Sequence, residues 1–317
     1  MSFSDSSSSP LGPLNPGDVV SAALRLYRDR FKTYLQLSAL ATLWIFGGFL
    51  GLALVVALLA GGLGAMGGET LALLGGLLGA ALGLLPLFYG VAKYTMISSV
   101  IGRLAFRDLI NQPETSLEAR RALNPKLGQF LLLGFLLALV FFATYLVAAL
   151  VATLVGVGSG LVVGGILGAL TNSTVGGIVG SILGIMLGLS IFLLGLIWVV
   201  SHLFIPDVVL AVEPSQDAGS SLGRSWDLTQ KSIGRIQIVF LATFLIQVPV
   251  LFVTNSLPSI LLAFVPESLT AMVISQGIGF ILSLAGSMVI LPLWQAVKGV
   301  LYYDLRSRRE GLDLELR

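Results

Sequence analysis

Residues 213–235 read EPSQDAGSSLGRSWDLTQKSIGR, a polar stretch that separates two long apolar runs of the chain. Asp217 is placed to cap the first free backbone N–H groups of a helix. From there Leu222, Trp226 and Thr229 fall on one face at the spacing of an amphipathic helix. The charged side chains turn away from that face: Arg224, Asp227 and Lys231. The stretch therefore predicts a short amphipathic helix on a membrane surface.

The composition places the rest of the chain in a bilayer. Of the 317 residues, 56% are hydrophobic and only 11% are charged, whereas soluble domains carry about 25% charged residues. Such a chain cannot bury its apolar surface by folding on itself, so lipid must be its solvent. The net charge is only +2, and the basic residues lie in separate clusters and not in one patch. This distribution argues against a nucleic-acid partner.

Residue types that usually carry metal and redox chemistry are nearly missing from the chain. It has no cysteine and one histidine, His202, which excludes disulfides, thiolate nucleophiles and zinc sites built on several imidazoles. No Gly-x-Ser-x-Gly motif accompanies His202, and Glu69 and Glu267 lie in separate short turns. The sequence therefore predicts a protein that is not an enzyme, with no catalytic residue, cofactor or metal.

Apolar segments long enough for transmembrane helices, about 20 residues each, occur six times. They pair into three hairpins, and the predicted fold class is an all-α integral membrane protein with amphipathic interfacial helices on the cytoplasmic side. The expected spans are about 33–60, 71–93, 127–155, 181–205, 236–257 and 269–297. The Gly-rich segment 156–180 is expected to be a separate re-entrant or surface-lying insertion, because the uncharged run around it exceeds two minimal spans.

The position of the charges indicates how the chain lies in the membrane. Residues 1–15 are rich in serine and proline and predict a disordered tail. An interfacial helix over 18–31 opens a single transmembrane domain, 16–305. All 18 Lys and Arg residues lie in or beside the N-terminal segment, the connections between hairpins and the tail 306–317. The positive-inside rule then places both termini in the cytoplasm, at a cell membrane or internal membrane.

Each hairpin is introduced by a basic segment with a helical pattern. The three segments are SAALRLYRDRFKTY (21–34), EARRALNPKLGQF (118–130) and SSLGRSWDLTQKSIGRI (220–236). Their spacing of roughly 100 residues indicates three copies of one unit, an interfacial helix followed by a helical hairpin.

Polar side chains at the membrane boundary are the candidates for a site, since hydrocarbon makes them costly. His202 fits an interfacial side chain bonded to a carbonyl, or a proton relay. Asp207 fits a helix cap, an ion pair with a basic residue of the neighbouring connection, or a substrate contact. Lys93 and Lys298 occupy similar places in the first and third hairpins, where they reach headgroups or form an anion site between repeats. Three amides line a polar path or bond across helices: Gln247, Asn255 and Gln276.

Glycines recur at every fourth position in two of the spans. The two series are Gly75, Gly79 and Gly83, and Gly176, Gly180, Gly184 and Gly188. This spacing places small residues on one helical face and lets backbones approach closely, either within the chain or between two copies of it.

Two short motifs, RSWDLTQKSIGRIQ at 224–237 and YYDLRSRREGLDLEL at 302–316, carry a family resemblance. The chain resembles the glycerophosphoryl diester phosphodiesterase membrane-domain family, which has similar A-x-x-R-S-W-x-L-T and Y-Y-D-L-R-x-R-x-E-G segments. The matching positions are Arg224, Ser225, Trp226, Leu228, Thr229, Tyr302, Tyr303, Asp304, Leu305, Arg306, Arg308, Glu310 and Gly311. The resemblance covers 16–316 and implies a multi-span bacterial membrane protein. It implies no phosphodiesterase activity, because the His- and Glu-bearing soluble barrel of fused members has no counterpart here.

Two function hypotheses follow from these observations. The first is a non-enzymatic multi-span protein that organises lipid or a protein partner through its basic cytoplasmic helices. The alternative is a transporter or export component for an apolar or amphipathic cargo, which a central cavity lined by Gln247 or His202 would favour. Expected partners are membrane lipids and another membrane protein or a second copy of the chain. The expected contact residues are Arg224, Trp226, Lys231, Lys93, Lys298 and Arg306. An ion pair between Arg224 and Asp304 is also expected.

Overall fold

The computed structural model describes residues 14–171, 174–262 and 268–312, and in these ranges every regular element is a helix. The elements are α1 (Pro16–Asp29), α2 (Phe31–Leu109), α3 (Ser116–Leu123), a 3-10 turn (Asn124–Lys126), α4 (Leu127–Thr171), α5 (Val175–His202), α6 (Pro206–Val212), α7 (Ala218–Thr229), α8 (Ile233–Leu251), a π-helical turn (Phe252–Ser256), α9 (Leu257–Leu262) and α10 (Leu269–Glu310). Five stretches of the described chain are long and apolar enough to cross a membrane: Phe31–Leu109, Ser116–Thr171, Val175–Val212, Ile233–Ser256 and Val273–Glu310. The expected all-helical class with long apolar helices is thereby confirmed.

Helix α2 turns back on itself at Gly67 and Gly68, in the turn between the expected spans 33–60 and 71–93. Gly68 has a φ of 74°, a left-handed conformation that glycine adopts without a steric penalty. The two limbs then pack closely, since a Cβ added at Gly79 would lie 2.7 Å from the Cα atom of Val56. This glycine series therefore serves packing within one hairpin.

Helices α4 and α5 form a second hairpin whose backbones also approach closely. A Cβ added at Gly180 would lie 2.3 Å from the backbone nitrogen of Gly164, which is the contact that small residues at every fourth position allow. The expectation of a separate insertion at 156–180 is wrong. Helix α4 continues without a break to Thr171, and α5 begins at Val175. The physical reason is that the glycine faces of the two helices pack against each other, and this packing stabilises helices and not a loop.

The third hairpin is less regular than the other two. Helix α8 contains Pro249, which has no N–H and removes a backbone hydrogen bond from the helix. A π-helical turn, Phe252–Ser256, follows directly after α8, and such single turns occur mostly within α-helices. The turn expected between the spans 236–257 and 269–297 falls partly on residues 263–267, which lie outside the described ranges.

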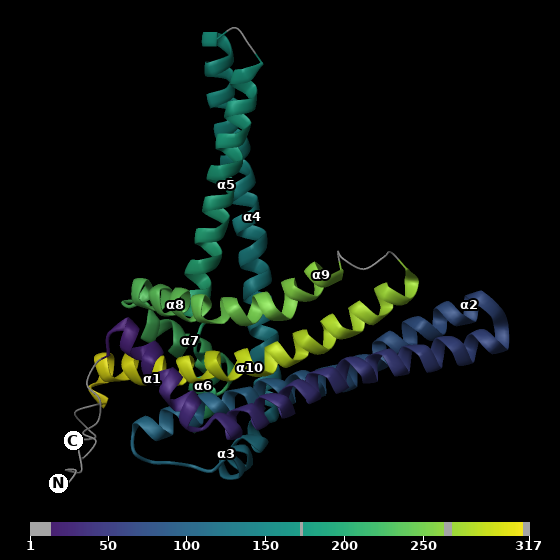
Figure 1. The fold of residues 1–317 in the computed structure, drawn as a ribbon, viewed down its shortest axis with the longest axis vertical. Coiled ribbons are helices and arrows are strands. Elements are labelled where there is room, and N and C mark those ends of the chain that lie inside the picture. Colours follow the sequence, from purple (N-terminus) through teal and green to yellow (C-terminus); the bar gives the residue numbers. More distant parts are fainter. Residues whose placement is uncertain (1–13, 172–173, 263–267, 313–317) are drawn as a thin grey trace.

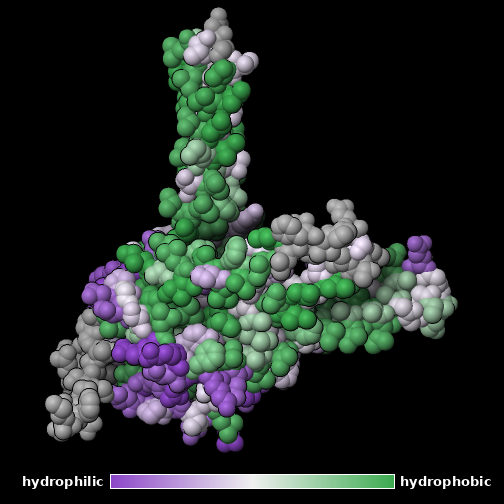
Figure 2. All heavy atoms as spheres, in the orientation of Figure 1, coloured by the Kyte–Doolittle hydropathy of each residue, from purple (hydrophilic) through white to green (hydrophobic). Residues whose placement is uncertain are grey.

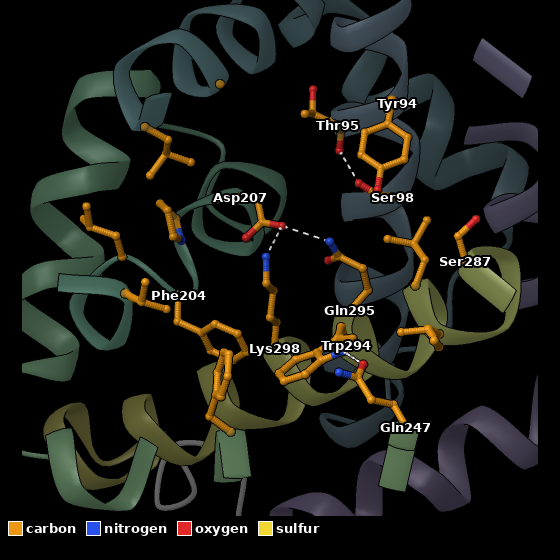
Figure 3. A pocket seen from close by; sticks show the side chains of 18 of the residues that line it. Tyr94, Thr95, Ser98, Phe204, Asp207, Gln247, Ser287, Trp294, Gln295 and Lys298 are labelled. Atoms are coloured by element: carbon orange, nitrogen blue, oxygen red, sulfur yellow. Dashed lines mark hydrogen bonds and ion pairs between the residues drawn. The ribbon is translucent and has the colours of Figure 1, made fainter. Parts of the chain in front are cut away.

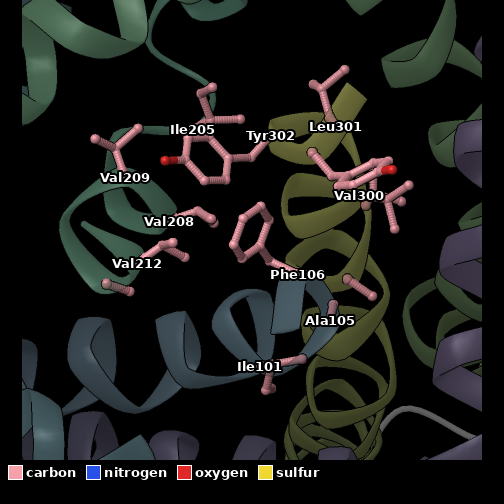
Figure 4. Packing of buried hydrophobic residues seen from close by; sticks show 14 of the residues in the cluster. Ile101, Ala105, Phe106, Ile205, Val208, Val209, Val212, Val300, Leu301 and Tyr302 are labelled. Atoms are coloured by element: carbon pink, nitrogen blue, oxygen red, sulfur yellow. The ribbon is translucent and has the colours of Figure 1, made fainter. Parts of the chain in front are cut away.

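The buried core lies where the hairpins begin and end, around α1, α3, α6 and α7, a region that we call the base (Figure 1). Figure 4 shows part of its packing. The rings of Phe106 in α2 and Tyr302 in α10 contact each other with centroids 5.1 Å apart. Ile205 and Val208, at the start of α6, are fully buried beside them. Burial of such a side chain is worth about 1.5–3 kcal/mol, so the base is the part that holds the hairpins together.

A buried carboxylate joins the N-terminal segment to the last helix. The side chain of Asp304 in α10 has no exposed surface, and its Oδ1 atom accepts a hydrogen bond from the backbone N–H of Leu14 at 2.7 Å. Arg235 lies 3.3 Å and Arg308 lies 3.0 Å from the same carboxylate. The negative charge is therefore matched by two guanidinium groups and a backbone donor.

Two boundaries expected near the chain ends lie closer to those ends in the structure. Leu14 is buried and Asn15 is the N-cap residue of α1, so the disordered tail expected over 1–15 does not reach its expected end. Helix α10 continues to Glu310, so the cytoplasmic tail expected over 306–317 begins inside a helix. The rest of both tails lies outside the described residues.

The hairpins leave the base in different directions (Figure 1). Helices α4 and α5 rise from it as one arm, whereas α2 and the α8–α10 hairpin extend to another side. On the face shown in Figure 2, apolar side chains cover the arms and polar side chains gather over the base. The short helices α1, α3, α6 and α7 lie at the base, and the arms diverge from it.

Candidate functional site

A cavity of about 900 Å³ lies where the arms meet the base (Figure 3). Its wall comes from α2, α4, the junction of α5 with α6, α8 and α10. Tyr94 and Ser98 belong to α2, Phe204 and Asp207 to the α5–α6 junction, and Lys298 to α10. Because all three hairpins contribute, the cavity forms only in the assembled fold.

One end of the cavity is polar. The Nζ atom of Lys298 lies 2.9 Å from Oδ2 of Asp207, and Nε2 of Gln295 donates to the same oxygen at 3.1 Å. The Lys298 ammonium also lies 5.5 Å from the centre of the Phe204 ring, within range of cation–π attraction. The side chains of Lys298 and Asp207 are only 20% and 14% exposed, so each charge depends on its partner.

Asp207 reaches this position because the chain leaves helical geometry after α5. Helical geometry resumes at Pro206, the first residue of α6. Proline suits this position because a backbone N–H in the first turn has no partner within the helix. Asp207 then lies in the first turn of α6. It forms an ion pair, as expected, but its partner is Lys298 of α10 and not a basic residue of the neighbouring connection.

Away from the polar end, the wall is mostly apolar. Its apolar members include Phe141, Leu251 and Ile290. Within this part, Nε1 of Trp294 donates to Oε1 of Gln247 at 2.7 Å. Gln247 therefore both lines the cavity and bonds across helices. The α10 residues of the wall run from Ser283 to Lys298, about 22 Å of helix, which exceeds the ~15 Å depth of hydrocarbon in one leaflet.

The expected contact residues Arg224 and Arg306 lie in a different cluster. Arg224 pairs with Glu213 at 3.2 Å and with Glu310, and Arg306 pairs with Glu310 at 2.8 Å. The formal charges of these two arginines and two glutamates cancel. The expected pair between Arg224 and Asp304 is wrong, because Asp304 is enclosed by the N-terminal segment and other arginines.

The amphipathic helix expected from residues 213–235 is present as α7, and Asp217 is its N-cap. The backbone N–H of Ser220 donates to Asp217 Oδ1 at 2.8 Å. This bond and a second one from the Ser220 hydroxyl hold the pKa of Asp217 below its ordinary value. The buried face differs from the expected one, since Trp226 is 37% exposed. The buried residues are Ala218, Ser221, Ser225, Leu228 and Thr229.

Trp226 packs against the end of α5. Its ring stacks on that of His202 with centroids 4.0 Å apart and planes 18° from parallel. The Nδ1 atom of His202 lies 3.1 Å from the Thr229 hydroxyl, so the ring contacts a hydroxyl and not the expected carbonyl. His202 is not part of the described cavity wall. Its contacts hold α7 against α5.

The other two expected contact residues, Lys93 and Lys231, have separate surroundings. The Nζ atom of Lys93 lies 3.4 Å from Oδ1 of Asn124 and 5.6 Å from the centre of the Tyr89 ring. Lys231 is exposed in the turn after α7. The described cavity wall includes Lys298 but not Lys93, so the structure does not bring these two lysines into one anion site.

Gln295 is one of the polar wall residues that the sequence did not identify. It stands three residues before Lys298 in LPLWQAVKGVLYYDL, residues 291–305. Residues three apart lie on one face of a helix. An amide and a lysine at this spacing inside an apolar run were the available signal. The partner of both, Asp207, is too distant in the sequence for spacing alone to identify it.

No protein-family model matches the chain, and comparisons with curated proteins and with solved structures find no match either. The resemblance to the glycerophosphoryl diester phosphodiesterase membrane-domain family therefore rests on the two quoted motifs and stays a prediction. The described residues contain no group of three or more His, Cys, Asp and Glu side chains that could hold a metal. The expectations of no enzymatic activity and no cofactor stay predictions as well. Fold and site define a class: an all-helical chain with long apolar helices around a cavity with one polar end.

Proposed function

We propose that the chain is a multi-span membrane protein that takes an amphipathic, lipid-like molecule from the bilayer into the cavity between its hairpins. The observation that carries this proposal is the charged pair of Lys298 and Asp207 at one end of an otherwise mostly apolar cavity. The polar group of the bound molecule lies at this pair, and its alkyl chain lies along α10. This is the cargo-carrying alternative among the two functions expected from the sequence.

The size and the chemistry of the cavity support this proposal. Its volume of about 900 Å³ is at the upper end of the ~300–1,000 Å³ range for small-molecule sites. An alkyl chain that leaves the bilayer gains little from an apolar wall, because the surrounding lipid tails are equally apolar. The polar end must therefore supply most of the selectivity, and so the Lys298–Asp207 ion pair is the main support for the proposal.

Blocking the cavity is expected to displace the lipid. Gly134 of α4 lies on the cavity wall, and a Cβ added there would meet nothing within 4 Å, so a larger side chain can enter the space. A Gly134→Trp variant should bind lipid about tenfold more weakly, equivalent to about 1.4 kcal/mol. Native mass spectrometry of the full chain, purified in mild detergent, measures the lipid retained per protein.

Gly128 provides the matched control for this variant. It belongs to the same helix, is exposed, has equally open surroundings and is not part of the described cavity wall. Gly128→Trp adds the same side chain and should retain lipid as the wild type does. Equal retention by all three proteins would contradict the proposal, and equal loss in both variants would show only a general disturbance of α4.

The proposal includes a topology of six spans in three hairpins, with α2 counted as two spans and both termini in the cytoplasm of a bacterial cell. The absence of cysteine makes single-cysteine labelling direct. A membrane-impermeant maleimide is expected to label Glu69→Cys, next to the bend of α2, in intact cells. It should label Lys231→Cys, in the turn after α7, only after lysis. Labelling of Lys231→Cys in intact cells would overturn the topology.

The other function expected from the sequence, organisation of lipid or a partner through Arg224 and Trp226, has less support. Arg224 and Arg306 are neutralised by Glu213 and Glu310, so their charges are not available to lipid headgroups. Trp226 and Lys231 keep exposed surface at α7. A partner at this surface stays a prediction.

A further inference from the structure

The polar end of the cavity contains two hydrogen-bond acceptors without donors. Within the part of the chain that the structure describes, neither Oδ1 of Asp207 nor Oε1 of Gln295 has a hydrogen-bond partner, and both atoms are buried. Gln295 is 5% exposed, and the direction of its amide is fixed because its nitrogen donates to Asp207 Oδ2. Buried acceptors left without a donor cost free energy, so a ligand that supplies donors gains at this site.

The charge at the polar end is already balanced. Among the described wall residues, Lys298 is the one cation and Asp207 the one anion, and they form a pair. The Lys298 ammonium has three N–H donors, and the bond to Asp207 Oδ2 uses one of them. The site thus offers two free acceptors and the remaining donors of one ammonium. A bound group of zero net charge would keep the buried charges balanced.

We infer that the cavity selects a phospholipid whose headgroup combines a phosphate with a hydrogen-bond-donating ammonium, as phosphoethanolamine does. The inference rests on the proposed function and specifies its cargo. The headgroup ammonium donates to Asp207 Oδ1 and Gln295 Oε1, and a phosphate oxygen accepts from Lys298. A phosphocholine headgroup carries the same charges but has no N–H donor. A phosphoglycerol headgroup has hydroxyl donors but carries a net negative charge that the site does not match.

The test offers the delipidated full chain an equimolar mixture of phosphatidylethanolamine, phosphatidylcholine and phosphatidylglycerol with identical acyl chains. Native mass spectrometry then counts each lipid on the protein. The ethanolamine lipid is expected to exceed the choline lipid about tenfold, the discrimination that unpaired buried acceptors give against an analogue without donors. Because charge and tail are the same in these two lipids, the difference reports the headgroup ammonium, through its N–H donors and its size, and a variant at Gln295 separates these two causes.

A Gln295→Met variant tests which atoms read the headgroup. It removes the free acceptor Oε1 together with the Nε2 donor to Asp207 Oδ2, and it leaves the Lys298–Asp207 pair in place. The preference for ethanolamine over choline should therefore fall to about threefold. Gly128→Trp serves again as the control and should keep the wild-type preference. If the protein binds ethanolamine and choline lipids equally, or if Gln295→Met keeps the full preference, the headgroup assignment is overturned and the proposed function stands. If it binds none of the three lipids, the proposed function fails too.

Discussion

An Asp304→Ala variant is expected to lose about 3–5 kcal/mol of the free energy of unfolding, the usual cost of removing one partner from a buried ion pair. The Asp304 side chain is fully buried and accepts from Leu14, Arg235 and Arg308. Its removal leaves two guanidinium groups and a backbone N–H without their common acceptor. It also removes the hydrogen bond that joins Leu14, just before α1, to α10, so the base should open at this point first. Denaturant titration in detergent, followed by tryptophan fluorescence, measures the loss.

A pair on the surface provides the comparison for Asp304. Asp29 lies 3.4 Å from Arg28, and both side chains are more than half exposed, at 56% and 80%. Such pairs contribute about 0–1 kcal/mol, so Asp29→Ala should leave stability nearly unchanged. A similar small effect in both variants would show that the Asp304 carboxylate does not hold the base together.

A Gly180→Ala variant is expected to force α4 and α5 apart. The added Cβ would lie 2.3 Å from the backbone nitrogen of Gly164 and 2.5 Å from the carbonyl oxygen of Gly160, against about 3.5–4 Å for ordinary contact. Backbone atoms cannot rotate away, so the helices must separate by about 1–1.5 Å along this face. Overpacking of this kind costs about 1–3 kcal/mol. Thermal unfolding followed by far-UV circular dichroism should show a lower midpoint.

The same change at Gly177 is the control, since this residue lies in the same helix and a Cβ there would meet nothing within 4 Å. Alanine is a better helix former than glycine by about 0.5–1 kcal/mol, so Gly177→Ala should be neutral or slightly stabilising. The two variants therefore differ in sign. A Gly180→Ala protein as stable as Gly177→Ala would mean that the close backbone approach does not exist in the folded protein.

The features that follow from composition and local pattern were predictable from the sequence. Long apolar segments dictated helices, because a backbone in hydrocarbon must satisfy its own hydrogen bonds. The bend at Gly67 and Gly68 lies in the expected turn, and Asp217 caps α7 as expected. Glycines at every fourth position indicated close helix packing, and the structure assigns that packing to the interior of two hairpins, α2 and α4–α5.

Contacts between hairpins were not predictable, because one charged residue has many acceptable partners far along the chain. Asp207 was expected to cap a helix, to contact substrate or to pair with a basic residue of the neighbouring connection. It pairs with Lys298 of α10. Arg224 was expected to pair with Asp304, yet the acids near it in space are Glu213 and Glu310. The insertion expected at 156–180 was wrong because the prediction assumed spans of ordinary length. Helices α4 and α5 are longer than that and take up residues 127–202 except for 172–174. The cavity arises from these long-range choices, and so the sequence revealed single wall residues but not the site.

The hydrogen bond between Leu14 and Asp304 joins residues 290 positions apart, which sets the timing of biogenesis. At about 5–20 residues per second, a ribosome needs roughly 15–60 s to make the second partner after the first. During that interval α1 has been synthesised but its partner in α10 has not. Its apolar face, which includes Val19 and Ala23 in the finished protein, stays uncovered by that helix. Docking of α1 on α10 is therefore a late event, and it closes the base only after the last helix has been made.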